Sequence, residues 1–109
     1  MPAEIAVHDL AARLERGEGL FLLDVRRPEE HAYAALPGTH LLVPLQELPR
    51  RRQEVTPPPG ATVVAYCHHG VRSWLAAEFL EAAGLPHVLS LAGGIDAWSR
   101  EVDPSVPRY

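Results

Sequence analysis

Apolar and polar positions along the 109-residue chain alternate between two patterns. Residues 8–16 place apolar side chains at helical spacing, whereas residues 20–24 form a short apolar run that is typical of a buried strand. The strand pattern returns at 40–43, 62–66 and 87–91. Short strands that alternate with helices predict an α/β fold with a mostly parallel central sheet of about five strands, flanked by helices on both faces.

Proline and glycine delimit the remaining segments. Pro28, followed by two glutamates, is typical of a helix start, and the three prolines within 56–60 predict a stiff surface loop. Helices are also expected over 45–53 and 95–100, and an extended tail over 104–107.

The helix expected after residue 73 carries one apolar stripe, which we expect to face the core. Its members are Leu75, Ala76, Phe79, Leu80 and Ala83. Trp74 lies off this stripe, so it is expected at a pocket rim or a partner interface, whereas Trp98 is expected to pack in the core.

Composition narrows the class of protein. The length suits one domain over residues 1–109, and the apolar fraction of 47% includes no run long enough for a membrane span. A single cysteine suits a reducing compartment, and no basic segment followed by an apolar stretch opens the chain, so a cytoplasmic location is expected. The net charge of −4 argues against nucleic acid as a partner, and no membrane partner is expected.

The candidate chemistry lies where the strand at 62–66 ends. Cys67 follows the strand directly, a short loop containing Gly70 comes next, and a helical pattern begins at once. Ligands in open α/β sheets bind at the carboxyl ends of strands, and loop amides there can form an anion-binding nest beside a helix N-terminus. A cysteine in such a nest is expected to ionise readily and to act as a nucleophile, with Arg72 adding a fixed positive charge.

The loop Cys67-His68-His69-Gly70-Val71-Arg72-Ser73 resembles the active-site loop of single-domain rhodaneses, Cys-x-x-Gly-x-Arg-Ser. Three further stretches agree with that family in order and spacing. They are Leu23-Asp24-Val25-Arg26 with Pro28-Glu29-Glu30, then Leu36-Pro37-Gly38, then Gly93-Gly94-Ile95-Asp96-Ala97-Trp98.

The resemblance implies a sulfurtransferase. Cys67 would take the outer sulfur of thiosulfate or a similar donor, hold it as a persulfide, and pass it to cyanide, a thiol or a protein. No cofactor is implied. By the same resemblance Asp24 orders the loops, while Arg26 helps to bind anions or braces the site; a purely structural ion pair is the alternative.

The other loop residues have more than one interpretation. Arg72 either attracts the anionic donor or pairs with an acid, and Ser73 supports the helix start with a hydroxyl that could reach the sulfur. Gly70 is expected to supply a backbone shape that other residues resist. His68 and His69 are expected to point apart at the pocket border, and without further Cys or His ligands no metal site is expected.

Two other function classes stay open. A sulfur carrier or regulatory binding module would use the same fold with little turnover of small molecules. A phosphatase or arsenate reductase is disfavoured, because four residues separate Cys67 from Arg72 where those relatives have five. The chain also has Ala34-Ala35 where many rhodaneses have glycine and histidine, and it has no second cysteine, so the sulfur acceptor must come from outside.

Overall fold

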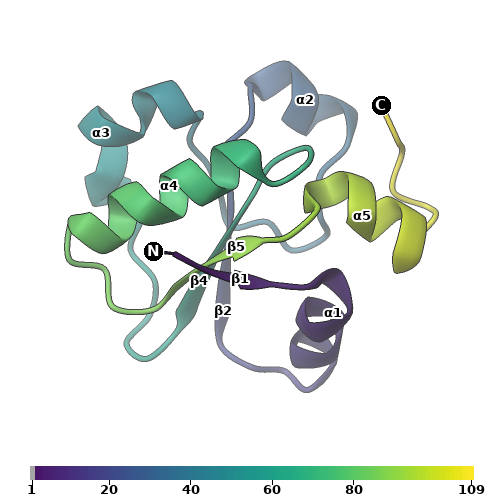
Figure 1. Cartoon of the computed structure of the whole chain (residues 1–109), viewed down its shortest axis with the longest axis horizontal. Helices are drawn as coiled ribbons and strands as arrows, with labels where there is room; N and C mark the ends of the chain where they lie inside the picture. The colour runs from purple at the N-terminus through teal and green to yellow at the C-terminus, as the bar shows by residue number, and fades with distance from the viewer. Residues whose placement is uncertain (1) are drawn as a thin grey trace.

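The computed structural model describes residues 2–109 and contains one five-stranded sheet, all of it parallel, in the order β1-β5-β4-β2-β3. Its strands are β1 (Ala3–Ile5), β2 (Leu20–Asp24), β3 (Leu41–Leu42), β4 (Thr62–Tyr66) and β5 (Val88–Leu91). The predicted α/β class and strand number are therefore confirmed. Because β4 lies between β5 and β2, the carboxyl ends of these three strands meet at one edge of the sheet (Figure 1).

Helices cover both faces of the sheet (Figure 1). They are α1 (Val7–Glu15), α2 (Pro28–Tyr33), α3 (Leu48–Arg51), α4 (Val71–Ala82) and α5 (Gly94–Glu101). The central strands alternate their side chains between two cores, as the two-residue period of a strand requires. Leu22 and Val64 pack with α1 and α5, whereas Leu23 and Val63 pack with α3 and α4. Within residues 2–109, no helix combines the length and the hydropathy needed to cross a membrane.

Two elements differ from the sequence-based expectation. Strand β1 was not predicted, because three residues are too few to show a period, and it pairs only with β5 at the sheet edge. The helix expected over 45–53 is instead a 3-10 turn at Leu45–Glu47, then α3, then a second 3-10 turn at Arg52–Glu54. Pro49 explains the break, because its ring would clash with the carbonyl four residues earlier in a continuous α-helix.

The apolar stripe predicted on helix α4 is confirmed in part, because Ala76 and Leu80 are buried and Phe79 packs against the core, whereas Leu75 and Ala83 are exposed. The buried residues of α4 are Ser73, Ala76, Ala77 and Leu80. The small alanines lie against the sheet, and this orientation leaves Leu75 44% exposed rather than in the core. Trp74 is half-buried beside it, and Trp98 packs in the core as predicted.

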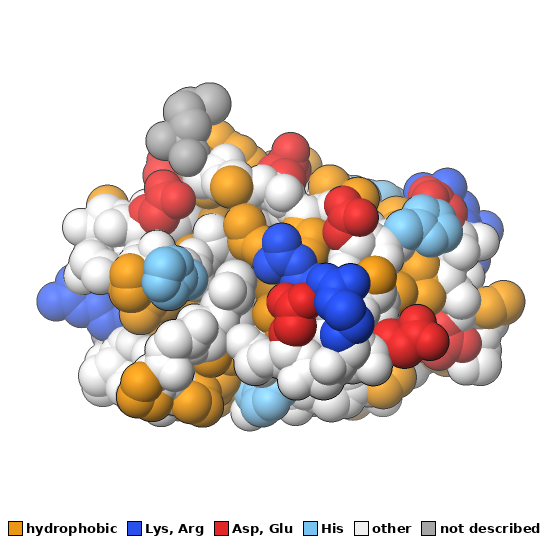
Figure 2. All heavy atoms as spheres, turned by 90° about the horizontal axis from the view of Figure 1, so that it is seen from below, with side chains coloured by type: hydrophobic (Ala, Val, Ile, Leu, Met, Phe, Trp, Pro, Cys, Tyr) orange, Lys and Arg blue, Asp and Glu red, His pale blue; other side chains and the backbone are white. Residues whose placement is uncertain are grey.

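Acidic and basic side chains are interleaved on the surface, as Figure 2 shows for one face. Several of them form ion pairs along the chain, among them Arg16 with Glu18 and Arg51 with Glu54. Exposed pairs of this kind contribute little to stability, on the order of 0–1 kcal/mol each. The charged groups that matter for the candidate site are the buried ones.

Candidate functional site

Cys67 directly follows β4 at the carboxyl ends of the central strands and is only 1% exposed. Its Sγ accepts hydrogen bonds from the backbone N–H groups of Gly70, at 3.1 Å, and Ser73, at 3.3 Å. The Ser73 hydroxyl lies 3.5 Å from the same sulfur. The loop thus turns its amides inward around the sulfur, an arrangement that stabilises negative charge on that atom.

The loop passes directly into α4 through Gly70. This residue has a φ of +110°, a conformation that side-chain-bearing residues rarely adopt. Ser73, fully buried one turn later, donates from its hydroxyl to the Gly70 carbonyl at 3.3 Å and shares a 2.8 Å hydrogen bond with the Ser90 hydroxyl of β5. The positive end of the α4 dipole therefore lies at the sulfur, in a position fixed by two neighbouring strands.

The Gly93-Gly94 turn clamps the loop from the other side. The N–H groups of Ile95 and Asp96, in the first turn of α5, donate to the carbonyls of Cys67, at 2.9 Å, and His68, at 3.0 Å. A Cβ on Gly94 would stand 2.5 Å from the Cys67 carbonyl oxygen and closer still to that of His68. Only glycine permits this approach, which gives a physical reason for the double glycine that the resemblance matched.

Asp24, the last residue of β2, and Arg26 form a fully buried ion pair. The Arg26 guanidinium donates to both Asp24 oxygens, at 2.8 and 2.7 Å, and to the carbonyl of Ala34 at 2.6 Å. His31 Nδ1 lies 2.9 Å from the same Asp24 carboxylate. Neither Asp24 nor Arg26 has exposed surface, so Arg26 braces the loops and offers no accessible face to an anion.

Arg72 pairs with Glu30, one of the two glutamates that the sequence placed at a helix start. Its guanidinium donates to both Glu30 oxygens, at 2.7 and 3.0 Å, while a third of the side chain stays exposed. Glu30 also accepts from the Arg27 N–H at 3.1 Å, which caps α2. The Arg72 hydrogen bonds outweigh burial and hold the pKa of Glu30 well below its usual range.

The tail folds back onto the loop instead of staying extended. Val106 is buried in the core, and the Tyr109 ring stacks on His68 with 3.9 Å between ring centroids. The Tyr109 hydroxyl accepts from Arg26 at 2.8 Å and donates to Glu30 at 2.8 Å. Sequence reasoning missed Tyr109 and Ser90 as site neighbours and did not place Glu30 against Arg72, because no local pattern signals a contact between positions so far apart.

His68 and His69 do not point apart. Their rings stack with centroids 3.9 Å apart, since Tyr109 holds the His68 ring on the loop surface. Burial and the neighbouring His69 lower the pKa of His68, which favours its neutral form. Ligand atoms of both histidines and of Asp96 lie within 4.8 Å of one another. A cation there would compete with Arg100 and Arg108, which already bind the Asp96 carboxylate.

The parallel sheet with a buried cysteine in an amide-lined loop places the chain among α/β proteins with a cysteine site at the carboxyl ends of the strands. Comparison with known proteins identifies the family. The rhodanese-like domain family matches residues 6–101. A sulfurtransferase from Allochromatium vinosum is 39% identical over 106 residues, which cover 97% of this chain and 96% of that protein. The chain belongs to the rhodanese-like domain family.

Two longer proteins extend the comparison. The crystal structure of a thiosulfate sulfurtransferase from Pseudomonas aeruginosa matches with a TM-score of 0.81 and 30% identity, over 91% of this chain and 19% of that one. YrkF of Bacillus subtilis, whose name gives it a provisional sulfur-carrier role, is 29% identical over 92% of this chain and 52% of its own length. The relatives thus include proteins named as sulfurtransferases and one provisionally named as a sulfur carrier.

The clamp at Gly94 can be tested by adding one methyl group. Gly94→Ala should destabilise the fold by more than Gly17→Ala, whose φ of +72° is similar but whose Cβ would meet nothing within 4 Å. Gly17→Ala is the control: because its Cβ meets no neighbour, its loss of stability reports backbone strain alone, about 1–2 kcal/mol. Urea unfolding measures both variants, and equal losses would show that the approach of α5 to the loop does not constrain residue 94.

The Glu30–Arg72 pair predicts a pH dependence of stability. The fold lowers the pKa of Glu30 from 4.5. Its contribution to the free energy of unfolding is therefore complete above pH 4.5 and is lost as pH falls toward the folded-state pKa. Glu30→Gln should lower the free energy of unfolding at about pH 7 by about 1–3 kcal/mol. On acidification to about pH 3.5, the free energy of unfolding should fall less in this variant than in the parent.

The matched control is Glu29→Gln, which removes an exposed carboxylate from the same turn of α2. Urea unfolding of the three proteins at both pH values measures the difference. An acid-induced loss as steep in Glu30→Gln as in the parent would contradict a stabilising role for the ionised Glu30.

Proposed function

We propose that this chain is a sulfurtransferase that carries sulfane sulfur on Cys67. The observation that carries the proposal is the direct hydrogen bonding of Cys67 Sγ by the amides of Gly70 and Ser73, at the N-terminus of α4. Buried amides aimed at a sulfur atom favour its anionic forms, which are the thiolate before transfer and the persulfide after it. The relatedness to a sulfurtransferase along nearly the whole chain supports the same activity.

The reaction divides into two displacements. The Cys67 thiolate attacks the outer sulfur of thiosulfate or a similar donor; the donor S–S bond breaks, and sulfite leaves with the electron pair. The acceptor, which is cyanide, a thiol or a protein nucleophile, then attacks the outer persulfide sulfur and displaces the Cys67 thiolate. Each step exchanges one sulfur bond for another, so no external oxidant or reductant is required.

The alternative is a sulfur carrier that transfers the persulfide only to a partner protein. Its support is the similarity to YrkF, and it uses the same Cys67 chemistry in the first half-reaction. The two functions differ in the second half-reaction, so turnover with small acceptors distinguishes them.

Intact-protein mass spectrometry after incubation with thiosulfate tests the first half-reaction. The parent should gain one sulfur atom that cyanide removes, and Cys67→Ala should gain none, because the only thiol is lost. Ser73→Ala, which keeps the amide but removes the hydroxyl near the sulfur, should retain the adduct. An absence of adduct with several sulfane donors would overturn the sulfurtransferase proposal.

Arg72 predicts an electrostatic effect on the donor step. Arg72→Gln should slow persulfide formation from thiosulfate about five- to tenfold, because it removes a positive charge beside the sulfur-binding loop. The effect should shrink as salt concentration rises. Stopped-flow kinetics measures both rates, with the exposed Arg50→Gln as control. An unchanged rate of persulfide formation would show that Arg72 does not assist the donor and serves only to pair with Glu30.

A further inference from the structure

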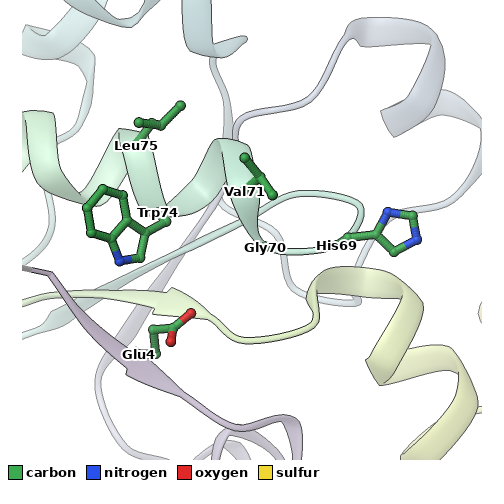
Figure 3. Close-up of a pocket in the computed structure, with 6 residues that line it drawn as sticks. All are labelled: Glu4, His69, Gly70, Val71, Trp74 and Leu75. Atoms are coloured by element: carbon green, nitrogen blue, oxygen red, sulfur yellow. The ribbon is translucent and has the colours of Figure 1, made fainter.

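A cavity of about 380 Å³ lies beside the cysteine loop, on the side of α4 that faces β1. Figure 3 shows Trp74 directed from α4 toward Glu4 of β1, with Val71 and Leu75 on the same helix. The lining residues are Glu4, His69, Gly70, Val71, Trp74 and Leu75. Most of this lining is apolar, although Val71 is 71% and Leu75 44% exposed to solvent.

The cavity reaches the reactive loop through Gly70. This residue forms part of the cavity wall, and its N–H donates to Cys67 Sγ. A group held in the cavity therefore lies against the same residue whose N–H binds the sulfur. The sulfur added in a persulfide extends about 2 Å beyond Sγ, which shortens the remaining reach.

The chemistry of the cavity does not suit the sulfur donor. A small dianion such as thiosulfate requires N–H donors or positive charge, which the loop amides and Arg72 provide. The cavity instead offers mostly aliphatic and indole surface, and Figure 3 shows the His69 ring directed away from the other lining side chains. Its one carboxylate, that of Glu4, forms an ion pair with no cation of residues 2–109. Its volume falls in the range of sites for small organic ligands, about 300–1,000 Å³.

We infer that this cavity binds the apolar body of a small-molecule thiol acceptor, one that is neutral or carries a positive charge. This inference rests on the proposed function and names the acceptor class for its second half-reaction. The thiol, having lost its proton to solvent, attacks the outer persulfide sulfur as a thiolate. A new S–S bond forms to the acceptor, and the old one breaks with its electron pair returning to Cys67.

A series of thiols tests the inference on protein already loaded with persulfide. Straight-chain thiols from ethanethiol to hexanethiol should react faster with each added methylene, by about two- to fourfold, until the cavity is filled. Single-turnover mass spectrometry measures the loss of the bound sulfur. Because loading is observed separately, a failure to form persulfide would count against the proposed function and not against this cavity.

Variants of the lining make the test specific. Trp74→Ala and Leu75→Ser should flatten the dependence on chain length while leaving persulfide formation unchanged. The control is Leu14→Ser, which removes a comparably exposed leucine from α1, outside the cavity. Retention of the full chain-length dependence in both lining variants would overturn the inference.

Charge gives a second, independent measurement. An amine-terminated thiol should react faster than a carboxylate-terminated thiol of equal length, and Glu4→Gln should reduce the difference by about two- to fivefold. If neither thiol length nor thiol charge changes the rate, small thiols do not occupy the cavity. Fast transfer only to a folded protein acceptor would likewise overturn the inference and assign the cavity to a macromolecular partner.

Discussion

The site depends on hydrogen bonds that run in opposite directions from one short loop. When the N–H groups of Gly70 and Ser73 turn inward to the Cys67 sulfur, nearby loop carbonyls turn outward and need partners. The N–H groups of Ile95 and Asp96 provide these partners, because the first turn of a helix has no internal acceptors for them. The Cys67 loop and α5 thus satisfy each other's hydrogen bonds, and the double glycine is the steric condition for their approach.

A set of paired charges fixes the loop from the α2 side. Asp24 with Arg26 is buried, and Glu30 with Arg72 joins α2 to α4. The hydroxyl of Tyr109 bridges the two pairs by accepting from Arg26 and donating to Glu30. Buried charges are tolerated only when they are paired and hydrogen-bonded, so each member of this network restricts the positions of the others. The network thereby connects the tail, α2 and the start of α4 around one cysteine.

The sequence was sufficient to predict those parts of the structure that a local pattern encodes. The apolar runs identified β2 and β4 because buried parallel strands are hydrophobic on both faces, and the order strand, cysteine, glycine, helix located the loop. It was insufficient where the outcome depended on distant partners. The stacking of His68 on Tyr109, the pairing of Arg72 with Glu30 and the exposure of Leu75 each follow from how elements meet, and no local period encodes that.

The exposure of Leu75 links the fold to the chemistry proposed for it. Because α4 places Ala76 and Ala77 on the sheet, two of its larger apolar side chains, Trp74 and Leu75, remain at the edge beside Gly70. Gly70 therefore borders two environments of opposite character, an anion-binding nest on its amide side and an apolar cavity on the other. In the ping-pong sulfur transfer proposed above, an anionic donor and a chemically different acceptor reach the same sulfur atom in turn. Separate surfaces for the two remove the conflict that a single pocket, either polar or apolar, would impose.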